Sequence, residues 1–395
     1  MNGLKIKQFR HILFLLDVLK LAATAFGGPQ VHLVQFQKKL VDKKKYITSD
    51  NLKELNSFCS ILPGPTSTQT ITAIGFKIGG PLLAFFTLAV WVFPACVIMG
   101  IFAIVIHFYH LENPKLNFLK YIQPMAVGFI IYAAFQIIQM FISKTYHWIL
   151  LVLSASVAIV YQTPYLFPVL LLLGGFVSSQ VNKEKSNIVK PLKNINWSNF
   201  ILFLAVFIIA AVLGAFTQNK IVLLFENTYR FGSIVFGGGH VLIPMMYNQF
   251  VEIKHYLTAN EFIAGVGLVQ AMPGPVFSIA TFCNAMALQE YGLSGQLLGA
   301  FIGTIAIFLP GTFLIFFIYP IWNQLKNFTP IKNAIEGVNA ASAGLVVASA
   351  YLLFKPVVLN QSNMIVLLLT LFLLLTTKVP SPIIVIICVL ASFIY

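Results

Sequence analysis

The chain alternates long apolar runs with short polar connections, and this pattern predicts helices that cross or enter a lipid bilayer. Apolar residues fill 58% of the 395 positions and charged residues only 9%, and the stretches 198–217 and 362–377 carry no charge at all. A helix needs about 20 apolar residues to cross a hydrocarbon core of about 30 Å. We therefore expect an all-α polytopic membrane protein with about 11–13 embedded segments.

The predicted elements follow one another in the same order twice. Thr48 to Asp50 has the residue types of a helix N-cap within an amphipathic, lysine-rich stretch at 30–60. The other predicted segments are apolar, and they are 9–28, 66–80, 81–109, 121–143, 147–161, 164–180, 198–217, 219–238, 265–289, 293–321, 336–355, 362–377 and 381–395.

Two short motifs show that the chain contains an internal repeat. Phe26-Gly27-Gly28 recurs as Phe236-Gly237-Gly238, and Pro63-Gly64-Pro65 recurs as Pro273-Gly274-Pro275, both displaced by 210 residues. Further along, Pro94/Pro310 and Gly128/Gly344 are displaced by 216 residues. Two homologous membrane halves, each interrupted by Gly and Pro at corresponding places, are typical of secondary transporters.

Charge distribution predicts that the two halves have opposite orientations in the membrane. Segment 38–47 carries five Lys and one Asp, whereas its repeat partner 248–257 carries one Lys and one Glu. Positive loops face the cytoplasm, so these equivalent loops should face opposite sides. The helix at 198–217 has no counterpart in the first half and would produce the inversion.

The expected domains are an N-terminal repeat at 1–180, a linker with the unpaired helix at 181–218, and a C-terminal repeat at 219–395. The N-terminus and the polar linker 182–196 are expected in the cytoplasm, because both carry positive charge. The N-terminal apolar segment resembles a signal peptide, but Asp17 and Lys20 interrupt it and the repeat contains a copy of it. We expect it to be retained.

The net charge of +14 has two interpretations. Cytoplasmic loops facing anionic lipid explain most of the excess, and an anionic substrate would explain the remainder. No basic segment accompanies a nucleic-acid reader module, so nucleic acid is not an expected partner. No cofactor and no metal are expected, because the four cysteines are scattered through apolar stretches without C-x-x-C spacing (Cys59, Cys96, Cys283 and Cys388).

The two Pro-Gly-Pro motifs are the candidate substrate-binding elements. Proline cannot continue a helix, so one helix should end before Pro63 and another should begin near Pro65. The new helix start presents unpaired N–H groups and a partial positive charge, which is an anion-binding arrangement. The candidate residues are Pro63, Gly64, Pro65, Ser67, Thr68 and Gln69 in the first copy, and Pro273, Gly274, Pro275 and Ser278, with Thr281 nearby, in the second. A purely structural kink is the alternative.

The glycine motifs and two intramembrane cations complete the candidate site. Gly27 and Gly28, with Gly237, Gly238 and Gly239, would either cap helices or form a second break facing the first. Lys20 and Arg230 match at the 210-residue displacement, and charge inside the membrane is usually functional. Alternatively, both side chains would snorkel to the membrane interface or form pairs, Lys20 with Asp17 and Arg230 with Glu226. The unmatched Lys77, opposite Ala287, would reach the interface, and His32 and His240 would be structural or carry protons.

With these residues in place, the chain resembles the chromate ion transporter family over nearly its full length. The segments that carry the resemblance are F-G-G-P-Q-V-H at 26–32, L-P-G-P-T-S-T-Q at 62–69, F-G-G-G-H at 236–240 and P-G-P-V-F at 273–277. The resemblance is to the fused two-domain members, and it implies export of chromate across the bacterial inner membrane. A homodimer is left open.

Three alternatives to chromate export stay open at this point. Another oxyanion, such as sulfate, would suit the same architecture. A membrane enzyme acting on a phosphorylated lipid would need a nucleophile with a base, or metal-ligand spacing, and neither pattern is evident. A non-transporting scaffold would not need two matched breaks. No nucleotide-binding P-loop is present, so the membrane potential is the expected driving force, with proton coupling open.

Overall fold

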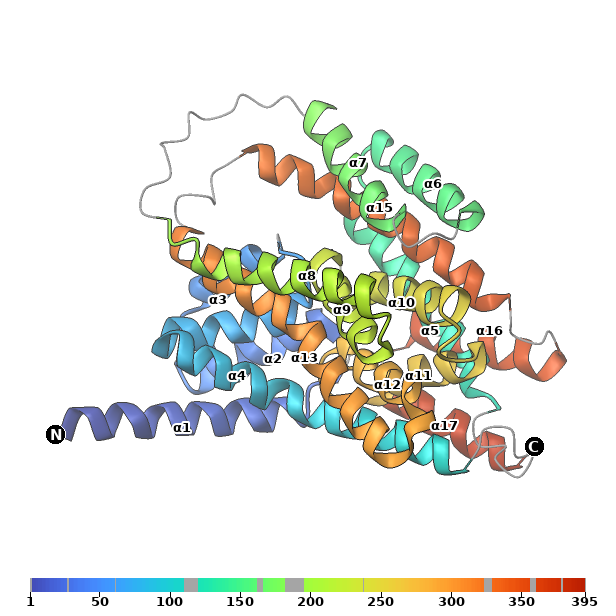
Figure 1. Ribbon diagram of the computed structural model, residues 1–395, viewed down its shortest axis with the longest axis horizontal. Coiled ribbons are helices and arrows are strands. Elements are labelled where there is room, and N and C mark those ends of the chain that lie inside the picture. The colour runs from blue at the N-terminus through green and yellow to red at the C-terminus, as the bar shows by residue number, and fades with distance from the viewer. Residues whose placement is uncertain are drawn as a thin grey trace.

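The computed structural model describes residues 2–26, 28–60, 62–109, 120–161, 166–181, 195–236, 238–322, 329–355, 360–377 and 379–394. Within these ranges the chain forms helices and turns and no strand, as expected for an all-α protein (Figure 1). Among the described residues five helices are long and apolar enough to cross a membrane, and α6, α7, α12, α16 and α17 are shorter apolar helices. The protein is a multi-pass membrane protein.

The first half consists of seven helices in the described residues. They are α1 (Asn2–Ala22), α2 (Gly28–Phe36), which continues into a π-helical turn (Gln37–Lys43), α3 (Ser49–Cys59), α4 (Thr66–Tyr109), α5 (Ile122–Phe141), α6 (Thr145–Val160) and α7 (Leu166–Val181). Helix α8 (Ser198–Thr217) follows and packs against α9 and α13. It is mostly exposed, as suits a helix facing lipid.

The second half repeats this order. It comprises α9 (Lys220–Ile234), α10 (Gly239–Tyr247), a π-helical turn (Asn248–Ile253), α11 (Ala259–Ala271), a 3-10 turn (Val276–Ser278), α12 (Ile279–Ala287), a 3-10 turn (Gln289–Tyr291), α13 (Gly292–Ile318), a 3-10 turn (Tyr319–Ile321), α15 (Thr329–Phe354), α16 (Gln361–Thr376) and α17 (Ser381–Ile394). The order of the predicted elements is confirmed, and most bounds agree to within a few residues. The bounds predicted at 9–28 and 336–355 are wrong by six or seven residues, because α1 and α15 each begin seven residues earlier, and the predicted element 265–289 comprises the end of α11, a break and α12. The 13-residue stretch 182–194 of the predicted linker lies outside the described residues.

Backbone geometry repeats along with the helices. Left-handed φ values occur at Gly28 and Gly238, at Gly64 and Gly274, and at Lys45 and His255, each pair being 210 residues apart. Thr48 caps α3 by accepting a hydrogen bond from the Asn51 N–H, and Thr258 caps α11 in the same way. The halves are therefore homologous in local structure, and the predicted N-cap at 48–50 is confirmed at Thr48.

Helix α4 is two rods joined at Gly80, where φ is 80° and ψ is −168°. The first rod covers 66–79 and the second 81–109, which confirms the predicted boundary between 80 and 81. In the second half the same boundary separates α12 from α13, and Gly292 has a φ of 66°. Pro94 and Pro310 lie within the long rods, α4 and α13.

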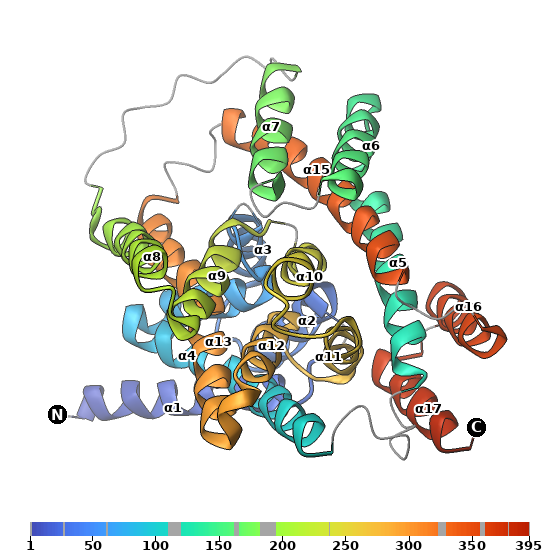
Figure 2. The same ribbon diagram turned by 45° about the vertical axis from the view of Figure 1, so that its right-hand side comes forward.

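Each half contains a helical hairpin of about half the membrane thickness. In the first half α3 and the rod 66–79 form it, with Pro63-Gly64-Pro65 at the tip. Eleven residues of α3 span about 16 Å, against a hydrocarbon core of about 30 Å. At the open end the Lys77 Nζ donates to Asn51 Oδ1 at 2.6 Å. Helices α11 and α12 form the equivalent hairpin, and both lie in the centre of Figure 2 with α2, α9 and α10.

The outer helices are exchanged between the halves. Helix α15 of the second half packs on α6 and α7 of the first, and α5 of the first half packs on α16 and α17 of the second (Figure 2). Matched glycines lie where α15 crosses α6 and where α5 crosses α16. Gly344 lies against Leu151 O and Ser154 on α6, and Gly128 lies against Leu367 O and Thr370 on α16. All three pairs of equivalent residues are 216 apart.

The orientation of the two halves can be tested by labelling Lys44→Cys and Lys254→Cys from each side of the membrane. Both lysines are exposed, and the four natural cysteines are buried, so an introduced thiol reports its own position. We expect a membrane-impermeant thiol reagent to reach residue 44 from the cytoplasm and residue 254 from the opposite side. Labelling of both residues from one side would contradict inverted repeats.

Candidate functional site

The tips of the two hairpins meet the glycine motifs of the opposite halves. The Gly64 N–H donates to Val235 O at 2.7 Å, and the Gly274 N–H donates to Ala25 O at 2.8 Å. Val235 and Ala25 directly precede the two Phe-Gly-Gly motifs, are themselves 210 residues apart, and are fully buried. Each half therefore completes the other at its centre. The two kinds of break lie together, which sequence spacing alone could not establish.

The first tip changes direction through glycine geometry. Gly64 has a φ of 117°, a conformation that favours glycine. Gln69 closes the turn, because its Nε2 donates to Pro63 O at 2.6 Å and its N–H donates to Pro65 O at 2.9 Å. The N–H groups that precede this first helical bond have no acceptor within the helix. Since the Gln69 side-chain amide is engaged with Pro63, its main role is to hold the turn.

A buried polar chain ties this tip to the Gly28 motif of its own half. His32 Nε2 lies 3.1 Å from Ala25 O, and its Nδ1 lies 2.9 Å from Ser67 Oγ. A carbonyl oxygen only accepts, so Nε2 carries the proton, and Nδ1 of the neutral ring accepts from the Ser67 hydroxyl. Ala25 O thus receives hydrogen bonds from both His32 and Gly274. His32 is consequently a structural link here, which is one of its two expected roles.

Trp91 holds the next residue of the same turn. Its Nε1 donates to Thr68 Oγ1 at 3.1 Å, and its ring stands edge-on to His32 with centroids 5.3 Å apart. Trp91, Thr68 and His32 are buried. Sequence reasoning missed Trp91, which lies 23 residues from Thr68 on the second rod of α4. An aromatic residue in an apolar run gives no signal for such a role.

The second tip differs from the first in how its helix begins. The sequence predicted the same arrangement at both starts, whereas the second copy begins with a 3-10 turn in which the Ser278 N–H donates to Pro275 O at 3.0 Å. That bond removes one of the free N–H groups expected there. The Ser278 Oγ is fully buried and has no hydrogen-bond partner in the described part of the chain. It is therefore the side-chain donor left available at this tip.

The glycine motifs border open space. Apart from the adjoining residues of the chain, no atom of the described residues lies within 4 Å of the position where a Cβ would stand at Gly28 or at Gly238, although Gly238 is buried. Gly239 by contrast is in close contact with Val276, so it allows the hairpin to approach. Gly27 and Gly237 lie outside the described residues. Thr281, further along the second copy, is engaged with Thr304 Oγ1 at 2.8 Å.

The two intramembrane cations have different surroundings. Arg230 is paired with Glu226, its Nε lying 3.5 Å from Oε1, and it also donates to Asn227 Oδ1. The alternative predicted for Arg230 is thus observed. Of the two alternatives predicted for Lys20, the pair with Asp17 is wrong, because Asp17 pairs instead with Lys44 at 3.3 Å and accepts from the Tyr46 hydroxyl at 3.0 Å. Snorkelling of Lys20 to the interface stays a prediction. Lys20 is exposed on α1.

The tips can therefore offer an anion several neutral donors but no unpaired charge. Free N–H groups at the start of α4, the positive end of its helix dipole and the Ser278 hydroxyl are the available groups. In such a site a doubly charged oxyanion would be held by hydrogen bonds in a dry environment, where they are strong.

Comparison with known proteins agrees with this architecture. The profile of a family described as "Chromate transporter" matches residues 12–179 and 222–393, once in each half. A chromate transport protein of Pseudomonas aeruginosa is 24% identical over 84% of this chain and 78% of its own length. A probable chromate transport protein of Synechococcus elongatus is 23% identical over 95% and 93%, respectively. An uncharacterised transporter of Methanocaldococcus jannaschii is 25% identical over 84% and 82%. No solved structure gives a significant match.

Proposed function

This chain belongs to the chromate transporter family, and from that premise we propose that it exports a divalent oxyanion, with chromate as the first candidate, across the bacterial inner membrane. Its relatives of that description match both halves and most of the length. The observation that carries the proposal is the pair of reciprocal bonds from Gly64 to Val235 and from Gly274 to Ala25, which brings both broken hairpins to one buried centre.

The proposed binding groups are those of the two tips and the two glycine motifs. Broken backbone within a membrane protein persists where it is buried or lines a cavity. Both tips are buried, and open space adjoins Gly28 and Gly238. The N–H groups at the start of α4 and the Ser278 hydroxyl would bind the oxyanion, with Pro63, Pro65, Pro273 and Pro275 fixing the breaks.

The driving force in this proposal is the membrane potential. Moving one elementary charge through 100 mV is worth about 2.3 kcal/mol, so a doubly charged oxyanion leaving a cell with a negative interior gains about 4.6 kcal/mol at that potential. Export of an anion therefore needs no nucleotide. Coupling to protons would add a pH gradient to this force.

The test is oxyanion flux into liposomes that contain the purified protein. With a potassium diffusion potential that is positive inside the liposomes, we expect chromate uptake that rises with the potential and that exceeds sulfate uptake at equal concentration. A pH gradient imposed without a potential measures proton coupling separately. Faster uptake of sulfate than of chromate would mean that the substrate is an oxyanion other than chromate. Absence of flux for both anions in folded protein would overturn the proposal.

A further inference from the structure

A cavity of about 760 Å³ lies at the open end of the first hairpin, away from its tip. Its walls come from α1 (Arg10, His11), from the π-helical segment (Val41) and the turn that follows it (Lys45 to Thr48), from the start of α3 (Asn51) and from the end of the rod 66–79 (Lys77, Ile78). The lining includes three permanent cations, Arg10, Lys45 and Lys77, and no carboxylate. The cavity is thus a basic opening beside a hairpin, large enough for an oxyanion with several waters.

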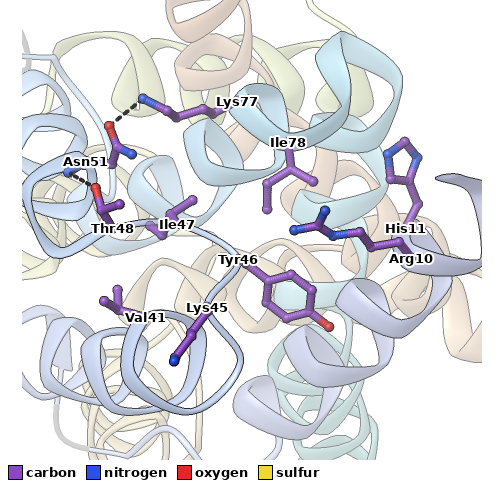
Figure 3. A pocket seen from close by; sticks show the side chains of 10 residues that line it. All are labelled: Arg10, His11, Val41, Lys45, Tyr46, Ile47, Thr48, Asn51, Lys77 and Ile78. Carbon is purple, nitrogen blue, oxygen red and sulfur yellow. Dashed lines mark hydrogen bonds between the residues drawn. The ribbon is translucent and has the colours of Figure 1, made fainter.

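Two of the three cations, Arg10 and Lys77, lie where a ligand in the cavity could reach them. Figure 3 shows the Arg10 guanidinium extending between Ile78 and Tyr46, and Lys77 reaching Asn51, while Lys45 lies on the rim and is directed away. Asn51 Oδ1 holds the Lys77 ammonium at 2.6 Å, so its charge is positioned but not neutralised. In the described part of the chain Arg10 and Lys45 form no ion pair, and the neighbouring Asp17 is engaged with Lys44 and Tyr46.

The second half shows that this fold does not require the basic lining. Arg10 corresponds to Lys220, which is paired with Glu290 at 2.9 Å. Lys45 corresponds to His255, Asn51 to the acidic Glu261, and Lys77 to the buried Ala287. The backbone is nevertheless the same, with φ of 52° at Lys45 and 49° at His255. The set of cations that lines the cavity in the first half is therefore not repeated at the equivalent positions of the second half.

The position of the cavity fits the route of an exported anion. It adjoins the lysine-rich segment 38–47, which the charge distribution places in the cytoplasm. Lys77 is ten residues from Ser67 on one rod, so the cavity and the buried tip are separated by about 15 Å. Clefts lined by one sign of charge raise the local concentration of counter-ions and speed their capture.

We propose that the cavity lined by Arg10 and Lys77 is a collecting site for tetrahedral divalent oxyanions, occupied from the cytoplasm before transfer to the hairpin tips. This assignment rests on the proposed function. The same chemistry would suit the phosphate of an anionic lipid headgroup, and the experiment separates these two sources.

The kinetic experiment uses the double variant Arg10→Gln/Lys77→Ala, with Lys53→Gln as the matched control. Alanine is chosen at position 77 because the equivalent position of the second half, 287, is alanine. Lys53 is exposed on α3, two residues from Asn51, and does not line the cavity. For chromate export in vesicles we expect the double variant Arg10→Gln/Lys77→Ala to raise the apparent KM by about tenfold with a maximal rate within about twofold. Its rate should also depend less on ionic strength. An unchanged KM and salt dependence in the double variant would overturn the collecting site.

The binding arm needs no transport. Ile78→Cys places a thiol in the wall of the cavity, and the natural cysteines are buried. In nanodiscs of phosphatidylcholine we expect sulfate, a non-oxidising probe, to slow modification of this thiol, and to lose that effect in the Arg10→Gln/Lys77→Ala background. Protection by sulfate in a protein that moves neither chromate nor sulfate would refute the proposed function and leave the anion site standing.

The lipid source is tested in the same assay. Protection of Ile78→Cys by phosphatidylglycerol in the nanodisc, with no competition from sulfate, would assign the cavity to a lipid headgroup and overturn its role in substrate collection. Equal reactivity with and without either anion would also overturn it.

Discussion

Replacing both tip glycines by alanine, Gly64→Ala with Gly274→Ala, is expected to abolish oxyanion transport while most of the protein still folds. Gly64 and Gly274 have φ of 117° and 103°, where a residue with a Cβ is strained by about 1–3 kcal/mol. The added carbon at Gly64 would also lie 2.8 Å from Gln69 Nε2, the group that closes the turn on Pro63. At Gly274 it would lie 3.0 Å from the Ala95 Cβ.

Each single variant should lower the flux by about tenfold, since about 1.4 kcal/mol corresponds to a factor of ten. The measurement is chromate uptake into liposomes, with folding checked by thermal unfolding in detergent. Gly214→Ala is the control, because this helical glycine on α8 faces only the end of the Leu223 side chain at 3.2 Å. Normal flux in a folded double variant would mean that the hairpin tips do not bind the substrate.

Pro65→Ala and Pro275→Ala test the same tips by another route. Proline removes a backbone donor and stops a helix from extending toward its N-terminus. Alanine at position 65 would allow α4 to grow into the break, and so would displace the free N–H groups at its start. We expect a strong loss of transport here too, and undiminished uptake by vesicles carrying both replacements would indicate that the prolines are simple kinks.

Local features of the fold could be predicted from the sequence because their signals are local. Pro63-Gly64-Pro65 ends one helix and starts the next, Gly80 and Pro81 divide α4, and Thr48 caps α3. Because the chain repeats, the equivalent elements of the second half could be predicted from those of the first. Helix α8 was recognised as unpaired by simple comparison of the two copies.

Contacts between the halves could not be predicted in this way. Apolar periodicity shows that a helix has a buried face but does not identify its partner, and a face that fits a helix of its own half also fits the homologous helix of the other half. The exchange of α6 and α7 with α16 and α17 between the halves is therefore invisible to the pattern. The matched Gly128 and Gly344 were the available trace of it, since both lie at these crossings.

The candidate site was located by sequence but its chemistry was only partly foreseen. The bonds from Gly64 and Gly274 reach across about 170 and 250 residues of sequence, respectively, so no spacing indicates them. The difference between the two tips depends on a 3-10 turn at Val276–Ser278, where both copies offer hydroxyl side chains. The basic cavity had one sequence signal, the unmatched Lys77, but its partners come from three separate elements.

The second large effect is expected at the crossing of α7 and α15, where Gly337→Ala should destabilise the assembly of the two halves. A carbon added at Gly337 would lie within van der Waals overlap of Gly174 O, and 2.5 Å from the Ser178 Cβ. Backbone atoms cannot move aside as the end of a side chain can, so the two helices must separate. Overpacking of this kind costs about 1–3 kcal/mol, and the contact with backbone places Gly337→Ala at the upper end of that range.

The neighbouring Gly175→Ala is the matched control, because its added carbon would lie 3.1 Å from Val338 Cγ2 and 3.3 Å from Ala334 O, contacts that shifts of a few tenths of an ångström relieve. We expect a clearly lower unfolding temperature for Gly337→Ala than for Gly175→Ala. Since α7 and α15 belong to different halves, a protease site placed in the linker 182–194 gives a second readout. After cleavage of the purified protein the halves should stay together in the wild type and in Gly175→Ala, and should separate more readily in Gly337→Ala. Equal retention of the halves in both variants would contradict the exchange of outer helices, because a crossing within one half would leave the contact between the halves intact. Equal unfolding temperatures would contradict the close approach of α7 and α15 at Gly337.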